Sequence, residues 1–408
     1  WGVFPSFSGA WRIINEPFME GTRNVLSDLK LRGGWGVLGN QAISYYSYQS
    51  VLDQANYSFG GTVVQGVAPV DGANRNLVWE TTETLNFGLD MGFLGNQYTL
   101  SIEGYRKLTY DILMKLPVST LYGLNAPYQN AGKVKNTGFE MTAGYKLNTH
   151  GWNFQVSANA AYNKNEVLDL KNGGARIWSG KYFNQEGYAI NSIGGYIAEG
   201  LFKTEEEVAN SATIPGTETA PGDIKYRDIN NDGKIDGEDR VYIGNTMPKW
   251  TFGLNLFAEW KGFDATFLFQ GAADVQGSLA GPGVVGEMIG AKGKPSYMYR
   301  DCWDAETNPN GKFPRAFSSY RQNNSIYNPS SFWIVNSSYL RLKNFQLGYT
   351  LPKEWCNVMG ISRIRVYYSG QNLLTFTKFD KGFDPESPEG GSSYPQVKTN
   401  TFGLNITF

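Results

Sequence analysis

The one motif with explicit chemistry is a short stretch, 228–239, which reads DINNDGKIDGED. Oxygen atoms recur there at the spacing that Ca²⁺ takes in EF-hand-like loops, and Gly233 stands where such a loop turns sharply. The expected ligands are five side chains and the backbone carbonyl of a lysine: Asp228, Asn230, Asp232, Lys234, Asp236 and Asp239. We therefore expect a structural Ca²⁺ that stiffens a loop. The alternative is an Asx-rich turn without an ion.

Few side chains of the chain are suited to act as a catalytic nucleophile, acid or base. The one histidine, His150, lies in a tight turn, which leaves almost nothing for Ser-His-Asp or Cys-His chemistry. Cys302 and Cys356 lie in no CxxC motif, and they either pair or stay free and packed. The carboxylates at 205–207 and 384–386 are interpreted as loop clusters rather than as a glycosidase pair. We expect that the chain is not an enzyme.

Aromatic side chains gather in the segments between the apparent strands. They could stack on sugar rings, but a place in an aromatic girdle or packing within the loops is the preferred interpretation. The residues concerned are Tyr45, Tyr46, Tyr297, Tyr299, Trp303, Phe332 and Trp333.

The composition indicates a sheet protein. Aromatic residues make up 15% of the chain against 18% for all charged residues, and there are 49 glycines. The net charge of −1 excludes the basic footprint of a nucleic-acid-binding protein. The longest apolar run, 332–335, is far short of the roughly 20 residues that a membrane helix needs. Barrel strands alternate apolar and polar residues, so the mean hydropathy of −0.37 does not argue against a membrane barrel.

Alternation with a period of two dominates the chain, as 84–93 illustrates, where Leu85, Phe87 and Leu89 alternate with Asn86 and Gly88. Runs of about ten such residues suit tilted strands that cross a bilayer. We predict eleven strands at 4–13, 28–38, 81–94, 97–112, 137–149, 151–168, 250–261, 263–275, 335–351, 363–377 and 399–408.

The connections alternate between tight turns and long loops, which is typical of an outer-membrane barrel. Tight turns are expected at 95–96, 150 and 261–262, on the periplasmic side. Long extracellular loops are expected at about 39–80, 113–136, 169–249, 276–334 and 378–398. The strand-like stretch 193–202 then has to belong to a loop hairpin and not to the wall.

The wall predicted for residues 1–408 is incomplete. Eleven strands are an odd number, and two open edges would leave unpaired amides in lipid. The chain also begins at Trp1 without a signal-peptide pattern. We expect that an N-terminal part, absent here, supplies the rest of the barrel.

The last strand ends the chain on an aromatic residue. Phe402, Leu404, Ile406 and Phe408 lie on one face of it. This pattern resembles the signal that the outer-membrane assembly machinery reads, and the alternative is an ordinary final strand of a soluble sheet.

Several segments resemble the SusC/RagA-type TonB-dependent transporters of Bacteroidetes, and they follow one another over nearly the whole chain. They lie at 2–8, 26–40, 79–83, 136–140, 228–245, 260–271, 339–344, 370–372 and in the terminal strand. The resemblance implies an all-β fold, namely a transmembrane antiparallel barrel of about 22 strands. This chain would then hold the C-terminal half of that barrel. The family's plug and TonB box are not visible in the chain.

The resemblance also implies a function and partners. It predicts import of an oligosaccharide or a peptide across the outer membrane, with a SusD-like surface lipoprotein, the TonB–ExbB–ExbD complex and outer-membrane lipid as partners. Transporter–lipoprotein pairs often form dimers in this family. The alternatives are a secreted calcium-stabilised β-sandwich that binds glycans, and a passive porin. Neither accounts for the alternating loop lengths together with the family segments.

Overall fold

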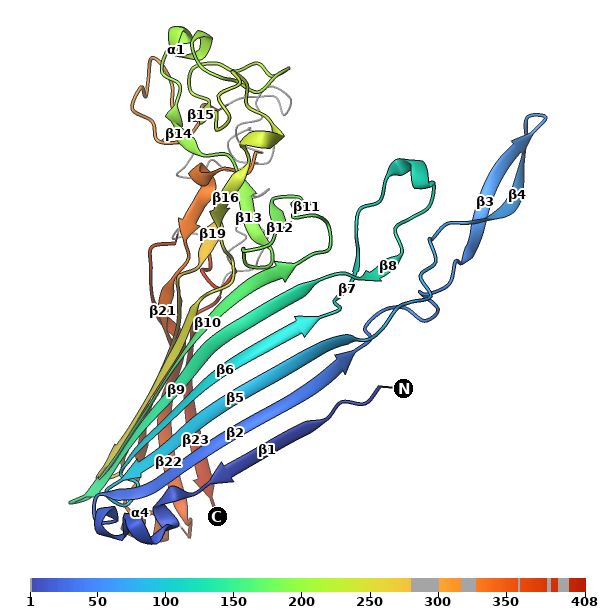
Figure 1. Cartoon of the computed structure of the whole chain (residues 1–408). Coiled ribbons are helices and arrows are strands. Elements are labelled where there is room, and N and C mark those ends of the chain that lie inside the picture. Colours follow the sequence, from blue (N-terminus) through green and yellow to red (C-terminus); the bar gives the residue numbers. More distant parts are fainter. Residues whose placement is uncertain (1, 280–300, 317–327, 359, 380–382, 388–395) are drawn as a thin grey trace. The chain divides into compact units, whose positions relative to one another are not determined.

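The computed structural model describes residues 2–279, 301–316, 328–358, 360–379, 383–387 and 396–408. Strands dominate it, and eleven of them form one large sheet, here called the wall sheet (Figure 1). The order of its strands follows their order in the chain, as expected when each strand pairs with the next through a hairpin or a loop.

All eleven predicted strands are confirmed, with ends that differ by a few residues. They are β1 (Ser6–Trp11), β2 (Leu26–Asn40), β5 (Glu80–Phe93), β6 (Tyr98–Tyr110), β9 (Lys133–Thr149), β10 (Trp152–Asp169), β17 (Trp250–Trp260), β18 (Phe263–Ala273), β21 (Tyr339–Thr350), β22 (Arg363–Thr377) and β23 (Thr399–Thr407).

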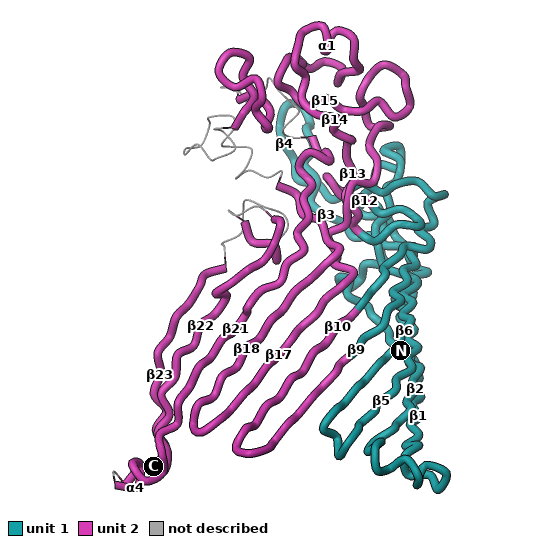
Figure 2. The backbone as a smooth tube through the Cα atoms, turned by 90° about the vertical axis from the view of Figure 1, so that its left-hand side faces the viewer, with its two compact units in different colours: residues 1–141, 162–178, 184–190 teal, residues 142–161, 179–183, 191–408 magenta. Residues whose placement is uncertain are grey.

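The chain divides into two compact units (Figure 2). Unit 1 comprises residues 1–141, 162–178 and 184–190, and unit 2 comprises 142–161, 179–183 and 191–408. β1, β2, β5 and β6 lie in unit 1, and β17 to β23 lie in unit 2.

In unit 1 the pairing of neighbouring strands separates an apolar from a polar face. Leu31 is opposite Leu89, and Leu89 is opposite Ile102 on the next strand. Asp90, one position along, is opposite Lys30 and Ser101. Because successive side chains of a strand point to opposite faces, this register sorts the two kinds of residue, as the alternation predicts.

Unit 2 shows the same division. Its apolar face carries aromatic pairs across neighbouring strands, with ring centroids 4.5 Å apart for Phe263 and Tyr349 and 4.9 Å apart for Phe267 and Phe345. Cross-strand aromatic pairs of this kind stabilise a sheet and fix its register.

Three of the short connections are tight turns in which the backbone adopts the left-handed conformation. Asn96 (φ 62°), His150 (φ 48°) and Lys261 (φ 48°) lie at these turns, and a glycine with positive φ adjoins each of them. Such primed turns match the twist of the strands that they join. The predicted turns are therefore confirmed.

The other two short connections contain helical turns. η1 (Ile13–Asn15) and η2 (Pro17–Thr22) follow β1, and α4 (Lys353–Val358) follows β21. Among the described residues, no helix is both long and apolar enough to span a bilayer.

The long connections form small structures of their own, outside the wall sheet. β3 (Leu52–Phe59) pairs with β4 (Thr62–Pro69), and β7 (Leu113–Lys115) pairs with β8 (Tyr128–Asn130). The connection from β10 to β17 holds β11 (Ile177–Ser179), β12 (Tyr182–Asn184), β13 (Ser192–Gly195), β14 (Ala198–Leu201), α1 (Glu205–Ala209), β15 (Ile224–Tyr226), η4 (Gly237–Asp239) and β16 (Val241–Gly244). The next long connection holds β19 (Gln276–Ser278), η5 (Ser331–Trp333) and β20 (Ile334–Asn336).

The stretch 193–202 lies outside the wall sheet, as predicted, but it is not a hairpin. β13 pairs with β12 and β16, whereas β14 pairs with β15. Tyr196, one of the two residues between these strands, instead bridges to Ser330. This contact joins residues that are far apart in the chain, and no local sequence pattern predicts it.

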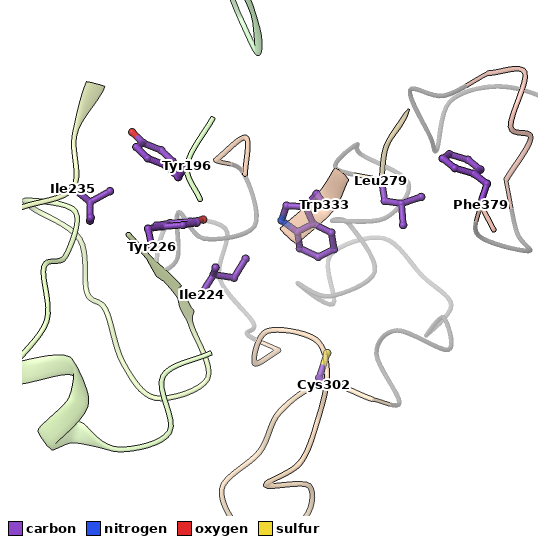
Figure 3. Close-up of a cluster of buried hydrophobic side chains, with 8 residues drawn as sticks. All are labelled: Tyr196, Ile224, Tyr226, Ile235, Leu279, Cys302, Trp333 and Phe379. Carbon is purple, nitrogen blue, oxygen red and sulfur yellow. The ribbon is translucent and has the colours of Figure 1, made fainter. Parts of the chain in front are cut away.

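The segments of unit 2 that connect wall strands share one hydrophobic core, and we call them the loop lobe (191–249, 274–279, 301–316 and 328–338). Trp333, 1% exposed, lies near its centre. Figure 3 shows the eight buried side chains of this core. They come from the four segments of the loop lobe and from the connection that follows β22: Tyr196, Ile224, Tyr226, Ile235, Leu279, Cys302, Trp333 and Phe379.

Candidate functional site

The polar face of unit 1 carries a network of charged and amide side chains on three neighbouring strands. Arg32 on β2 donates to Asp90 on β5 at 3.2 Å and also pairs with Glu103 on β6. Asn86 donates to Glu103 at 2.9 Å, and Ser101 donates to Asp90 at 2.7 Å. A face with paired charges and amides suits a water-filled interior rather than lipid.

Unit 2 repeats this arrangement near the tight turn that joins β17 to β18. Arg365 on β22 donates to Asp264 on β18 at 2.8 Å and to Gln346 on β21 at 2.8 Å. One guanidinium thereby connects three consecutive strands, and its planar donor set suits such a fork.

Among the described residues, the most deeply buried ion pair joins the wall sheet to the connection between β22 and β23. Arg341 on β21 donates to Asp384 at 2.7 Å, with 3% and 4% of their side chains exposed. Glu386 lies 3.0 Å from the same guanidinium and 3.4 Å from Lys343. We call the segment 383–387 the strap.

The strap's connection is held at two further points. Before it, Phe379 is buried in the loop-lobe core, and its N–H donates to Thr377. After it, Asn372 on β22 donates to the carbonyl of Val397 at 3.1 Å. The cluster at 384–386 is therefore a structural anchor on the polar face. Sequence reasoning missed this, because Arg341 and Asp384 are 43 positions apart.

The stretch 228–239 folds as a set of carboxylate-capped turns. Asp228 accepts hydrogen bonds from the N–H groups of Asn231 at 2.6 Å and Gly233 at 2.8 Å. Asp239, fully buried, accepts from Ile229 and Asp236, each at 2.8 Å. Hydrogen bonds from backbone N–H groups to these carboxylates therefore shape the loop by themselves.

Lys234 adds a cation to this loop. Its amine lies 2.8 Å from Asp236 and 3.3 Å from Asp232. Hydrogen bonds to these two carboxylates raise the pKa of Lys234 above its ordinary value, and the same contact lowers the pKa of Asp236. Over the described part of the chain, no three acidic, histidine or cysteine side chains converge as metal ligands. A bound Ca²⁺ would therefore have to displace the Lys234 amine.

A partly buried salt bridge connects two segments of the loop lobe. Arg315 donates to both oxygens of Asp223, at 2.8 and 3.2 Å, and its N–H donates to the carbonyl of Gly222. A side chain at Gly222 would meet Trp303 at 2.4 Å. The segment 301–316 is thus packed closely against 220–226.

Both cysteines are free and buried, so the predicted alternative of packed thiols is confirmed. Burial raises the pKa of the Cys302 thiol to about 11, and the neighbouring Asp301 adds to the effect. His150 is exposed in its turn, as predicted, and its Nδ1 lies 2.7 Å from the Thr149 hydroxyl.

The loop aromatics divide into two groups. Trp303 and Trp333 are buried in the loop lobe, which confirms packing as their role. Tyr45 and Tyr46 are exposed, and their role in ligand binding stays a prediction. Tyr297 and Tyr299 lie outside the described residues.

The terminal strand exposes the predicted residues on one face. Phe402 and Phe408 are 84% and 88% exposed, and Leu404 and Ile406 are also exposed. Phe402 is opposite Tyr368 on β22, with ring centroids 5.3 Å apart. An exposed apolar face of this kind needs lipid or a partner surface to cover it.

Alternating faces, paired charges on the polar side and long folded connections together define a wall of an outer-membrane transport barrel. The family model described as "TonB dependent receptor-like, beta-barrel" matches residues 1–373, and the chain belongs to this family. The family consists of outer-membrane transporters, not enzymes, so the β-sandwich and porin alternatives are wrong.

Relatives from Bacteroidetes match over the whole chain. TonB-dependent receptor P3 of Formosa agariphila is 31% identical, and the match covers 100% of this chain and 42% of the receptor. TonB-dependent receptor SusC of Bacteroides thetaiotaomicron is 29% identical, covering 100% and 40%. The chain spans about two fifths of the length of these relatives.

Among solved structures, the RagAB peptide transporter is similar, with a TM-score of 0.78 and 28% identity. The match covers 99% of this chain and 43% of the chain in that structure. The RagAB peptide importer in the closed-closed state gives a TM-score of 0.77, with 28% identity and coverage of 99% and 43%. The predicted SusC/RagA type and partial barrel are therefore confirmed.

Proposed function

We propose that this chain forms the C-terminal part of the barrel of a TonB-dependent importer that carries an oligosaccharide or a peptide across the outer membrane. One observation supports this above all. An eleven-stranded wall with separated faces coincides, over 99% of the chain, with part of a solved peptide transporter.

In this proposal the short turns face the periplasm and the long connections face the outside. The predicted extracellular loops at about 39–80, 113–136, 169–249, 276–334 and 378–398 then include the β3–β4 hairpin, the loop lobe and the strap. The polar face, with its Arg32 and Arg365 networks, lines the passage. The apolar face, with its aromatic pairs, contacts lipid.

The proposed partners follow from the family. A SusD-like surface lipoprotein would deliver the nutrient to the loops, and the TonB–ExbB–ExbD complex would supply energy through parts of the transporter outside residues 1–408. A dimer of transporter–lipoprotein pairs is a further expectation.

The proposal is tested in the host that carries the gene. Deleting the gene should abolish growth on the oligosaccharide or peptide that the transporter imports, and deleting tonB should have the same effect. Complementation with the full-length protein should restore growth. Affinity purification in mild detergent should recover a surface lipoprotein with it. Unchanged growth on every such nutrient, or extraction without detergent, would contradict the proposal.

We further propose that the stretch 228–239 binds a structural Ca²⁺. The oxygen-rich spacing and the preformed turns support it, while Lys234 competes for the same carboxylates. In a calorimetric titration, full-length protein should take up Ca²⁺ at millimolar concentration, and Asp228→Asn should abolish the uptake. Asp304→Asn is the matched control, because Asp304 also caps a turn of the loop lobe. Absence of any uptake by the unaltered protein would refute the metal site.

A further inference from the structure

A cavity of about 370 Å³ lies in unit 2 between the loop lobe and the segment that precedes it. Four separate segments line it, so it exists only when they fold together. The residues concerned are Gly180, Lys181, Ile193, Arg240, Ser278, Pro329, Ser330 and Ile334. Its size is that of a site for a small ligand or for one terminal unit of a larger ligand.

The lining of this cavity is basic. Lys181 and Arg240 are its charged residues, and none of the described residues that line it is Asp or Glu. The hydroxyls of Ser278 and Ser330 add hydrogen-bonding groups, and Ile193 and Ile334 add apolar surface. The described part of the lining, with two cations and no carboxylate, favours an anionic group.

Both cations are held by their surroundings. Arg240 Nη2 donates to the carbonyl of Gly180 at 3.0 Å, which places the guanidinium beside Lys181. The backbone carbonyl of Lys181 accepts a hydrogen bond from Gly194 N–H at 2.9 Å. The side-chain amine of Lys181 lies 5.4 Å from the centroid of the Tyr182 ring. The carboxylate that precedes Arg240, Asp239, is already bound by two backbone N–H groups.

We propose that this cavity binds a carboxylate of the imported nutrient, with Arg240 as the principal contact and Lys181 as the second. A guanidinium matches the two oxygens of a carboxylate in one plane, and the aliphatic lining contacts the rest of the terminal unit. The inference rests on the proposed import function. It narrows the substrate class to ligands that carry a carboxylate, either the C-terminus of a peptide or an acidic sugar.

The test is a binding titration of full-length protein in detergent, with matched pairs of probes. One pair is a tetra-alanine peptide with a free C-terminus and the same peptide amidated. The other is a tri-galacturonate and its methyl ester. We expect one charged probe to bind at least about tenfold more tightly than its neutral partner, which corresponds to one charge-assisted hydrogen bond. The pair that responds identifies the source of the carboxylate.

Variants assign the binding to this cavity. Arg240→Gln and Lys181→Gln should each remove most of the preference for the charged probe. Arg227→Gln is the control, because Arg227 is a cation of the same lobe that pairs with Glu199 outside the cavity. Equal binding of charged and neutral probes, no binding of either charged probe, or a preference that survives Arg240→Gln would overturn the inference. The import proposal is judged separately, by the growth phenotype of the gene deletion.

Discussion

At the scale of single residues, the most consequential side chains are the buried charges on the polar face. Arg341 and Asp384 are almost fully buried, so their charges have lost most of their hydration and depend on each other. Exposed pairs such as Lys249–Asp274 differ, because water screens both partners and the pair contributes little.

We predict that Arg341→Gln loosens the strap, since it leaves the Asp384 carboxylate buried without its partner. Removing one member of a buried pair costs roughly 3–5 kcal/mol. The measurements are the urea midpoint of the purified full-length protein and the rate of protease cleavage within 378–398. Lys249→Gln should change neither. The double variant Arg341→Met with Asp384→Leu should regain much of the loss, and failure to regain any would contradict this explanation.

A second residue-scale prediction concerns pH. The folded protein raises the pKa of Cys302 to about 11, whereas an unfolded thiol titrates near its ordinary value of about 8.5. The folded state therefore holds this proton more tightly. Its contribution to stability is complete below about pH 8.5 and is lost as the pH rises towards 11. We expect iodoacetamide to label Cys302 slowly at pH 8 and faster as the pH approaches 11. Rapid labelling of native protein at pH 8 would contradict this.

At the scale of elements, the tight turns decide whether neighbouring strands meet in register. Gly151 and Gly262 occupy equivalent places in two of these turns, with φ of 82° and 86°. Their surroundings differ: a Cβ at Gly262 would lie 2.7 Å from the Thr350 carbonyl oxygen, whereas a Cβ at Gly151 would meet nothing within 4 Å.

This contrast gives a matched pair of variants. Gly151→Ala should cost only the left-handed backbone strain, about 1–2 kcal/mol. Gly262→Ala should cost more, because a backbone oxygen must also shift. Urea unfolding of the two full-length variants, each compared with the unaltered protein, measures the difference. Equal losses would show that the Thr350 contact is not limiting.

The terminal strand supports a second element-scale prediction. If Phe402, Leu404, Ile406 and Phe408 form the assembly signal and the lipid contact, then Phe408→Asp should sharply lower the amount of folded protein in the outer membrane. Thr407→Asn, at the end of the same strand, should have little effect. The measurement is heat-modifiable migration of outer-membrane protein, and unchanged levels of the Phe408→Asp variant would disprove the signal.

At the scale of the whole molecule, the wall sheet ends in two edge strands, β1 and β23. Unpaired backbone groups in lipid cost several kcal/mol each, so a membrane sheet has to close. We predict that residues 1–408 expressed alone do not form a protease-resistant barrel in lipid vesicles, whereas the full-length protein treated identically does. Stable insertion of the isolated 408-residue chain would refute this.

How far the sequence predicts the structure varies from one region to another. All eleven wall strands and the three tight turns are predictable, because residues two positions apart share a face and glycine or asparagine accepts positive φ. The loop lobe is harder. The pattern of 193–202 predicts a loop hairpin, but Tyr196 pairs with Ser330 instead. The spacing of the candidate Ca²⁺ ligands predicts them, whereas no sequence pattern predicts that the Lys234 amine contacts Asp236.

By itself, the sequence determined the strand pattern, the two faces and the family, since each depends on residue order over short distances. Only the tertiary structure decided which distant residues meet. It brought Asp384 to Arg341, Asp223 to Arg315, and Lys181 to Arg240 at one cavity. The physical reason is that loop contacts depend on how several connections fold together over one wall, and a periodic pattern carries no information about such pairings.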